Sequence, residues 1–308
     1  MSKAVWWLTF NAFVLAMLAL DIKLFHRKAH AVKVREALLL TSFWVGLAIL
    51  FNIGVYLVLG RTKALEFLTC YLIEESLSID NLFVFLMLFS YFGVRPEHQH
   101  RVLFWGILGA VVMRLSFILA GVALIQRLHW VVYIFGAFLI YAGIRMALPK
   151  RREVHPERNP VLKLLRRFMP VSDGYGGGRF FVKEAGRYIA TPLFVVVVAV
   201  ETTDVIFAID SIPAALAISH DPFVVYTANI FAVLGLRSIF FALAGIVRTF
   251  RYLHYGLAVV LAFTGVKMLL SRHLHIPLGF ALALIAAVVA VSIAASVLNP
   301  PKASNHDG

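Results

Sequence analysis

Two acidic motifs lie inside hydrophobic stretches of this sequence, EESLSIDN at 74–81 and ETTDVIFAIDSIPA at 201–214. Each motif is near the middle of an apolar stretch that is long enough to cross a bilayer as a helix. A carboxylate at that depth costs about 3 kcal/mol on insertion scales. The two segments together carry six carboxylates, so these groups are expected to have a function. A path for cations through a membrane is the simplest one.

The composition is typical of an integral membrane protein. Of the 308 residues, 61% are hydrophobic and 15% are charged, and the mean hydropathy is +0.86. With a minimum of about 17 residues for a helical crossing, nine membrane spans are predicted. They are approximately 4–20, 36–60, 64–92, 102–125, 130–148, 191–219, 222–247, 252–271 and 277–298. We therefore expect an all-α polytopic membrane protein that forms a single membrane domain over residues 1–308.

The distribution of Lys and Arg predicts the orientation in the membrane. With the N-terminus outside, twenty of these residues fall in cytoplasmic segments and five on the opposite side. Such an excess is typical of the cytoplasmic face, so the N-terminus is expected outside and the C-terminus inside. The segment 149–190 holds ten of the twenty and is predicted to be a basic cytoplasmic loop. Anionic headgroups then account for the net charge of +13, and no nucleic-acid partner is needed.

An internal duplication organises the predicted spans. Three successive spans (64–92, 102–125 and 130–148) resemble the next three (191–219, 222–247 and 252–271). The matches are Glu74 with Asp204, Asp80-Asn81 with Asp210-Ser211, RLSFILAG from Arg114 with RSIFFALAG from Arg237, and GIRM at 143–146 with GVKM at 265–268. Three is an odd number, so the second copy must cross the membrane in the opposite sense. The sequence thus predicts an inverted repeat, an architecture that recurs among transporters with a site at the midplane.

The candidate metal ligands in the two motifs all offer oxygen atoms. They are Glu74, Asp80, Asn81, Glu201, Asp204, Asp210 and Ser211. Oxygen ligands suit Mg²⁺, Ca²⁺ and Mn²⁺, whereas Zn²⁺ or Cu²⁺ would be expected to recruit imidazole or thiolate. Arg114 and Arg237 lie deep in predicted spans and are expected to compensate part of the negative charge. The structural alternative is that these ion pairs only lock the helices together.

Helix geometry predicts where the acids lie relative to one another. If the two acidic helices run in opposite directions, Glu74 should be level with Asp210, and Asp80 level with Asp204, on two rungs roughly 9 Å apart. Pro213 leaves the carbonyl of Ile209 without its helical donor and disfavours a straight helix there. Glu201 and Asp210 are nine residues apart, so they could face one cavity only if the helix unwinds near Pro213 or if several helices enclose that cavity.

Four segments carry a resemblance to a known family. LIEESLSIDNLFVFLMLFSYF (72–92), YIFGAFLIYAGIRMAL (133–148), VETTDVIFAIDSIPA (200–214) and NIFAVLGLR (229–237) resemble the TerC family of integral membrane proteins, and most closely its Alx branch. The resemblance covers about 51–277 and implies export of manganese from the cytoplasm. It also implies that the seven candidate ligands lie on the acidic motifs of the family. Glu75 departs from that pattern, which argues against a role for it as a ligand.

The sequence and the resemblance together predict a Mn²⁺ exporter of the cytoplasmic (inner) membrane that works against protons. The expected partners are a divalent metal ion as substrate and the lipid bilayer, and neither a cofactor nor an enzymatic activity is expected. Two alternatives remain open at this point. One is a Ca²⁺ transporter, and the other is a non-transporting scaffold or subunit of a tellurium or redox stress complex. Because Cys70 is the only cysteine, the chain cannot form an intrachain redox couple.

Overall fold

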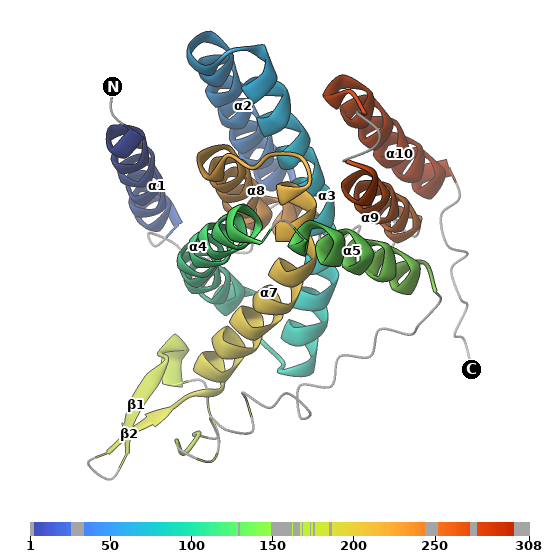
Figure 1. Cartoon of the computed structure of the whole chain (residues 1–308). Helices are drawn as coiled ribbons and strands as arrows, with labels where there is room; N and C mark the ends of the chain where they lie inside the picture. Colours follow the sequence, from blue (N-terminus) through green and yellow to red (C-terminus); the bar gives the residue numbers. More distant parts are fainter. Residues whose placement is uncertain are drawn as a thin grey trace.

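The computed structural model describes residues 3–25, 34–128, 130–148, 162, 167, 169–172, 174, 176–184, 187–243, 252–271 and 276–298. Helices dominate this part of the chain (Figure 1). The α-helices are α1 (Lys3–Phe25), α2 (Val34–Leu59), α3 (Arg61–Tyr91), α4 (Pro96–Arg127), α5 (Val131–Ala147), α7 (Pro192–Leu216), α8 (Pro222–Leu243), α9 (Leu253–Leu270) and α10 (Leu278–Leu298). Each predicted span coincides with one of these helices.

Six of the described helices are long and apolar enough to cross a membrane: α2, α4, α7, α8, α9 and α10. The apolar parts of α1 and α5 are shorter, Ala4–Leu20 and Val131–Ala147. Helix α3 is long, but it carries Glu74, Glu75 and Asp80 in its middle and second half. The chain is therefore a polytopic α-helical membrane protein.

Four helices form the centre of the molecule. Helix α3 packs against α7 and α8, and α4 packs against the same two helices. Helices α1 and α2 cover α8 through aromatic contacts, such as the stacked rings of Trp7 and Tyr226 and the contact between Phe51 and Phe231. On the other side, α5 crosses α9, and α10 packs on α9 and α3 (Figure 1). Residues far from both ends of the central helices are thus shielded by protein on several sides.

The crossing of α5 and α9 depends on two glycines. A methyl group on Gly143 would lie 2.7 Å from the carbonyl oxygen of Ala258, and one on Gly265 would lie 2.6 Å from that of Gly136. Real Cβ atoms do not approach backbone atoms so closely, so only glycine permits this contact. These two glycines are the first residues of the matched GIRM and GVKM segments.

Helix α7 is continuous through Pro213 and ends at Leu216. Of the two alternatives for the acids of this helix, unwinding near the proline is therefore not observed. Pro213 cannot donate a backbone hydrogen bond to Ile209, which costs free energy. The helix continues nevertheless, and its last turns, from Ser211 to Leu216, are entirely buried against their neighbours. The acids of α7 are consequently enclosed by surrounding helices rather than gathered by a break in their own helix.

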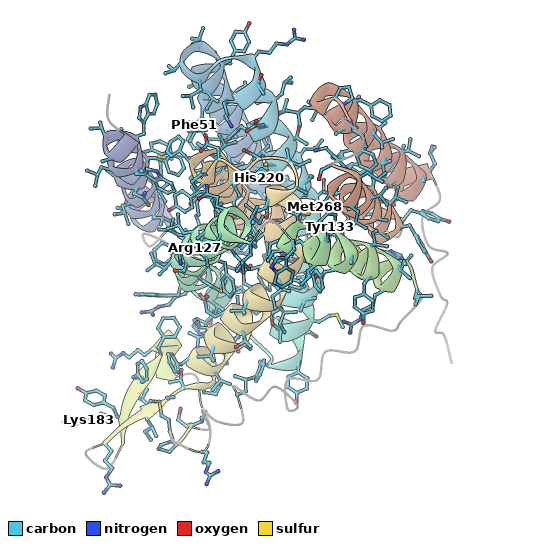
Figure 2. All side chains as sticks on the ribbon, in the orientation of Figure 1. Phe51, Arg127, Tyr133, Lys183, His220 and Met268 are labelled. Carbon is cyan, nitrogen blue, oxygen red and sulfur yellow. The ribbon has the colours of Figure 1, made fainter. Side chains whose placement is uncertain are left out.

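Part of the segment 149–190 is ordered into a small antiparallel hairpin of β1 (Phe181–Glu184) and β2 (Arg187–Ala190). These strands were not predicted from the sequence. Arg101 near the start of α4 donates a hydrogen bond to the carbonyl oxygen of Gly178 (2.6 Å) and lies over the ring of Phe180. The hairpin extends away from the helices, with Lys183 near its tip (Figure 2). Most of residues 149–175 lie outside the described residues.

Candidate functional site: a buried arginine between two acids

Arg114 on α4 lies between acids from two other helices. Its Nε donates to Asp204 Oδ2 (3.1 Å) and its Nη2 to Asp204 Oδ1 (3.0 Å), so the aspartate is held at both oxygens. Its Nη1 donates to Glu74 Oε2 (2.9 Å) and to Asn229 Oδ1 (3.1 Å). We call Glu74, Arg114, Asp204 and Asn229 the Arg114 cluster. It joins α3, α4, α7 and α8 at one point.

The cluster is almost completely removed from solvent. Arg114 and Glu74 are each 1% exposed, Asp204 is 4% exposed and Asn229 is 0% exposed. Asp204 is twelve residues from each end of α7, and Glu74 is thirteen from the start of α3. The cluster therefore occupies the middle of helices that are long enough to cross a bilayer. Two carboxylates and one guanidinium leave a net charge of −1 when all are ionised.

Two buried polar atoms of the cluster have no hydrogen-bond partner in the described part of the structure. They are Glu74 Oε1 and Asn229 Nδ2. Such atoms usually cost about 1–3 kcal/mol when they remain unsatisfied. A third example is Ser211 Oγ on α7, which is also buried. By contrast, Thr203 on the same helix donates to the carbonyl of Ala199, four residues earlier. Glu74 and Asn229 thus hold more hydrogen-bonding capacity than the Arg114 cluster uses.

Glu201 is separate from the Arg114 cluster although it is only one helical turn before Asp204. Its carboxylate is half-buried and lies against Gly109 of α4. No hydrogen bond or ion pair links it to another residue within the described ranges. It is therefore a carboxylate inside the helical core without the compensation that Arg114 provides for Asp204.

The remaining candidate ligands lie on α3 and α7, outside the Arg114 cluster. Asn81 is buried on α3, and Asp210 is half-buried on α7. Asp80 lies on α3, but its side chain is outside the described part of the structure. The carboxylate of Glu75 lies near Gly235 of α8, apart from that of Glu74. Within the described residues, no three His, Cys, Asp or Glu side chains are grouped closely enough to hold a metal ion.

The two-rung prediction placed Glu74 and Asp204 on separate rungs, and the structure brings their charges to one guanidinium. The Glu74 carboxylate lies 2.9 Å from Arg114 Nη1 and the Asp204 carboxylate 3.0 Å from Arg114 Nη2. The prediction placed the acids by helical rise along parallel axes. The length of the glutamate and arginine side chains lets the two charges meet across that distance.

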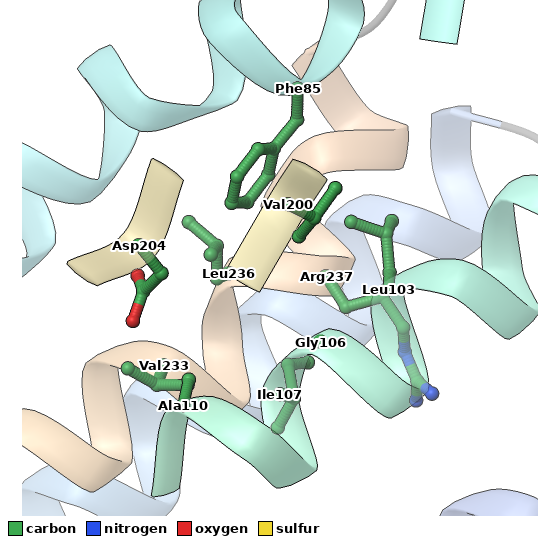
Figure 3. A pocket seen from close by; sticks show the side chains of 10 residues that line it. All are labelled: Phe85, Leu103, Gly106, Ile107, Ala110, Val200, Asp204, Val233, Leu236 and Arg237. Carbon is green, nitrogen blue, oxygen red and sulfur yellow. The ribbon is translucent and has the colours of Figure 1, made fainter. Parts of the chain in front are cut away.

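A small cavity adjoins the cluster (Figure 3). Asp204 and Arg237 are the charged residues that line it, and the other lining side chains are apolar, among them Phe85, Val200 and Leu236. In Figure 3 the guanidinium of Arg237 points away from the Asp204 carboxylate, whereas the stem of its side chain lies along the cavity. Of the two arginines predicted to compensate charge, Arg114 is the one that binds Glu74 and Asp204.

Two features of the site were not predicted from the sequence. Asn229 lies in the NIFAVLGLR segment, and its amide within an apolar helix was the available signal. The second feature is a polar cluster where α3 begins and α7 ends. Glu66 accepts hydrogen bonds from Lys63 (2.7 Å) and from the hydroxyl of Ser219, and Lys63 lies 3.7 Å from Asp221. These contacts tie the start of α3 to the connection between α7 and α8.

The fold and the site define a class: a polytopic helical membrane protein with a charged cluster at the centre of its core. Residues 59–304 match the family described as integral membrane protein TerC family. The chain belongs to this family.

Relatives extend over nearly the whole chain. An uncharacterized membrane protein of Myxococcus xanthus is 48% identical over 301 residues, which cover 98% of this chain and 94% of that protein. Proteins named "Putative membrane-bound redox modulator Alx" are 42% identical in Photorhabdus laumondii (97% of each chain) and 44% identical in Escherichia coli K12 (93% of this chain and 92% of that protein). No solved structure matches the chain significantly.

Proposed function

We propose that this protein exports Mn²⁺ from the cytoplasm through the carboxylates at the centre of α3 and α7, in exchange for protons. The observation that carries the proposal is the Arg114 cluster, in which two carboxylates from different helices are buried at mid-helix around one cation. Buried ionisable groups inside a membrane protein most often mark an ion pathway. Their oxygen ligands suit Mn²⁺.

An inverted repeat of α3–α5 and α7–α9 is part of the proposal, and the helix contacts support it. A twofold axis would exchange α3–α5 with α7–α9. Under this symmetry the contact of α3 with α8 is equivalent to that of α7 with α4, and both contacts are extensive. Each helix also packs against its own counterpart, as α5 does against α9. At that crossing, Gly143 meets Ala258 and Gly136 meets Gly265, which are equivalent pairs when GIRM is aligned with GVKM.

Arg114 has a specific place in the proposed cycle. In this conformation its guanidinium already binds the carboxylates that Mn²⁺ would need. We propose that Mn²⁺ displaces Arg114 from Glu74 and Asp204, and that Arg114 returns when the ion leaves. Without Mn²⁺, the guanidinium of Arg114 then remains between the two carboxylates. This lowers the free-energy cost of a conformational change in the protein without bound substrate. The unpartnered Glu74 Oε1 could supply a further ligand after Arg114 has moved.

The topology belongs to the same proposal. All nine described α-helices cross the cytoplasmic membrane, with the N-terminus outside and residues 149–190 in the cytoplasm. The excess of Lys and Arg in the cytoplasmic segments supports this orientation. Helices α3, α5 and α8 then run inward, whereas α4, α7 and α9 run outward. In this orientation the hairpin of β1 and β2 lies on the side from which Mn²⁺ enters.

Purified protein in liposomes provides the test. With an imposed pH gradient, the wild type should accumulate Mn²⁺, whereas Asp204→Asn, Asp80→Asn and Asp210→Asn should abolish the flux and remain in the membrane. Glu97→Gln is the matched control, because Glu97 is a carboxylate in the first turn of α4 with about half of its side chain exposed. Equal flux in Asp204→Asn and Glu97→Gln would contradict the proposal.

One observation favours a second candidate, a non-transporting scaffold. Arg114 satisfies both oxygens of Asp204 and one of Glu74, as a purely structural ion pair would. A scaffold predicts no Mn²⁺ flux by well-folded wild-type protein in liposomes. A Ca²⁺ transporter would instead show uptake of Ca²⁺ that Mn²⁺ fails to inhibit.

A further inference from the structure

Three glycines of α4 make room for side chains of α7. A methyl group on Gly106 would lie 3.0 Å from Val200, and one on Gly121 would lie 2.8 Å from Leu216. Gly109 differs from both, because its nearest neighbours are the carboxyl carbon and both carboxylate oxygens of Glu201. The carboxylate therefore lies directly on the backbone of α4, in space that any other residue at 109 would fill.

The Glu201 carboxylate occupies the space left by the missing side chain of Gly109, and no hydrogen bond from the described residues holds it there. Within the described ranges it has no hydrogen-bond or ion-pair partner, whereas Asp204 is bound at both oxygens by Arg114. The two acids are three residues apart on α7, a rise of about 4.5 Å. Glu201 is nearer the Pro192 end of the helix, so its charge lies between that end and the Arg114 cluster.

We infer that Gly109 is a positioning residue that seats the Glu201 carboxylate as the first ligand that a divalent cation meets on its way to Asp204. This inference rests on the proposed function. A cation that arrives from the Pro192 end meets a carboxylate without a bound arginine. The guanidinium of Arg114 has to leave Asp204 only when the cation moves on from Glu201 to Asp204. The seat keeps the carboxylate one turn from Asp204, so that both acids can contact one ion during the transfer.

The chain offers a matched pair of substitutions for the test. Gly109→Ala leaves the helices free to pack as before, because the clashing atoms are the far end of a flexible side chain, but it pushes the carboxylate out of its seat. Gly121→Ala makes the same change on the same helix against Leu216 and serves as the control. Initial rates of Mn²⁺ uptake into liposomes are measured over a range of Mn²⁺ concentrations. The same rates are measured for Glu201→Ala and for the double variant Gly109→Ala/Glu201→Ala.

We expect Gly109→Ala to raise KM for Mn²⁺ about tenfold with a smaller change in kcat, and Gly121→Ala to leave both constants near those of the wild type. In the Glu201→Ala background, Gly109→Ala should have no further effect, because the displaced group is already absent. The inference is overturned if Gly109→Ala matches Gly121→Ala, or if its effect persists unchanged in Glu201→Ala. If folded wild-type protein transports no Mn²⁺ into liposomes, the proposed function itself is refuted, and the inference with it.

Discussion

Arg114 holds Asp204 at both carboxylate oxygens from a position that is 1% exposed, ninety residues away in sequence. Two parallel hydrogen bonds between a guanidinium and a carboxylate give both strength and a fixed geometry. The same guanidinium also binds Glu74, so α3, α4 and α7 share one charged contact. This contact joins the central helices at one point, and in the proposed cycle it also competes with the ion for the carboxylates.

Removal of the Arg114 charge should destabilise the protein. Arg114→Gln leaves two carboxylates buried without a cation, and the loss of one partner from a buried ion pair costs about 3–5 kcal/mol. The triple variant Arg114→Gln/Glu74→Gln/Asp204→Asn should recover most of this loss, because no buried charge remains in the cluster. Thermal unfolding in detergent measures both effects. Arg145→Gln, at an exposed position of α5, is the control and should be neutral.

Mn²⁺ binding should weaken as the pH falls. The ligands are carboxylates that must be deprotonated to bind the ion, so protons compete with it, and Kd should rise by up to about tenfold per pH unit in the acidic range. Equilibrium binding of Mn²⁺ to detergent-solubilised protein between pH 8 and pH 5 checks this trend. A Kd that is constant over that range would contradict competition between protons and Mn²⁺ for the ligands.

The single thiol should play no part in metal binding. Cys70 is 0% exposed, and its Sγ donates to the carbonyl oxygen of Ala215 (3.6 Å). Cys70→Ser should therefore bind Mn²⁺ as the wild type does, and neither protein should prefer Zn²⁺. Competition between the two ions in the binding assay is the measurement. Tight Zn²⁺ binding that disappears in Cys70→Ser would show that the assignment of oxygen ligands is wrong.

The crossing of α5 and α9 should be sensitive to a single methyl group. Gly143→Ala places a methyl group 2.7 Å from the carbonyl of Ala258 and 2.9 Å from the amide nitrogen of Ala262, so backbone must move. We expect a loss of about 1–3 kcal/mol, measured as a lower midpoint of thermal unfolding. Gly46→Ala on α2 meets nothing within 4 Å and should leave the midpoint unchanged or raise it. Equal midpoints for the two variants would contradict this account of the crossing.

The proposed orientation can be tested with introduced cysteines. In a Cys70→Ala background, a cysteine at Gly176 should resist an impermeant thiol reagent in intact cells and react after lysis. A cysteine at Lys63 should react in intact cells, because Lys63 lies on the opposite side of the membrane in this topology. The reverse pattern of labelling would invert the orientation, and with it the side from which Glu201 is reached.

The sequence by itself determined the helices and the chemical character of their centre. Apolar stretches of about 17 residues or more have few alternatives to a helix in a membrane, because every backbone polar group must be satisfied within the segment. For the same reason the acids of 74–81 and 201–214 stood out against their surroundings, as did Arg114. The nine predicted segments therefore coincide with helices, and the candidate residues could be named before any contact was known.

Only the tertiary structure decided which charges meet. Arg114 contacts residues that are 40, 90 and 115 positions away, and these contacts depend on the inclination of four helices and on the reach of each side chain. Spacing along a single helix cannot supply that information, so it could not show that Glu74 and Asp204 share one guanidinium. The seat of Glu201 is a similar case. A glycine in α4 has no side chain to mark its role, and its importance emerges only from the carboxylate that the packing of α7 places against it.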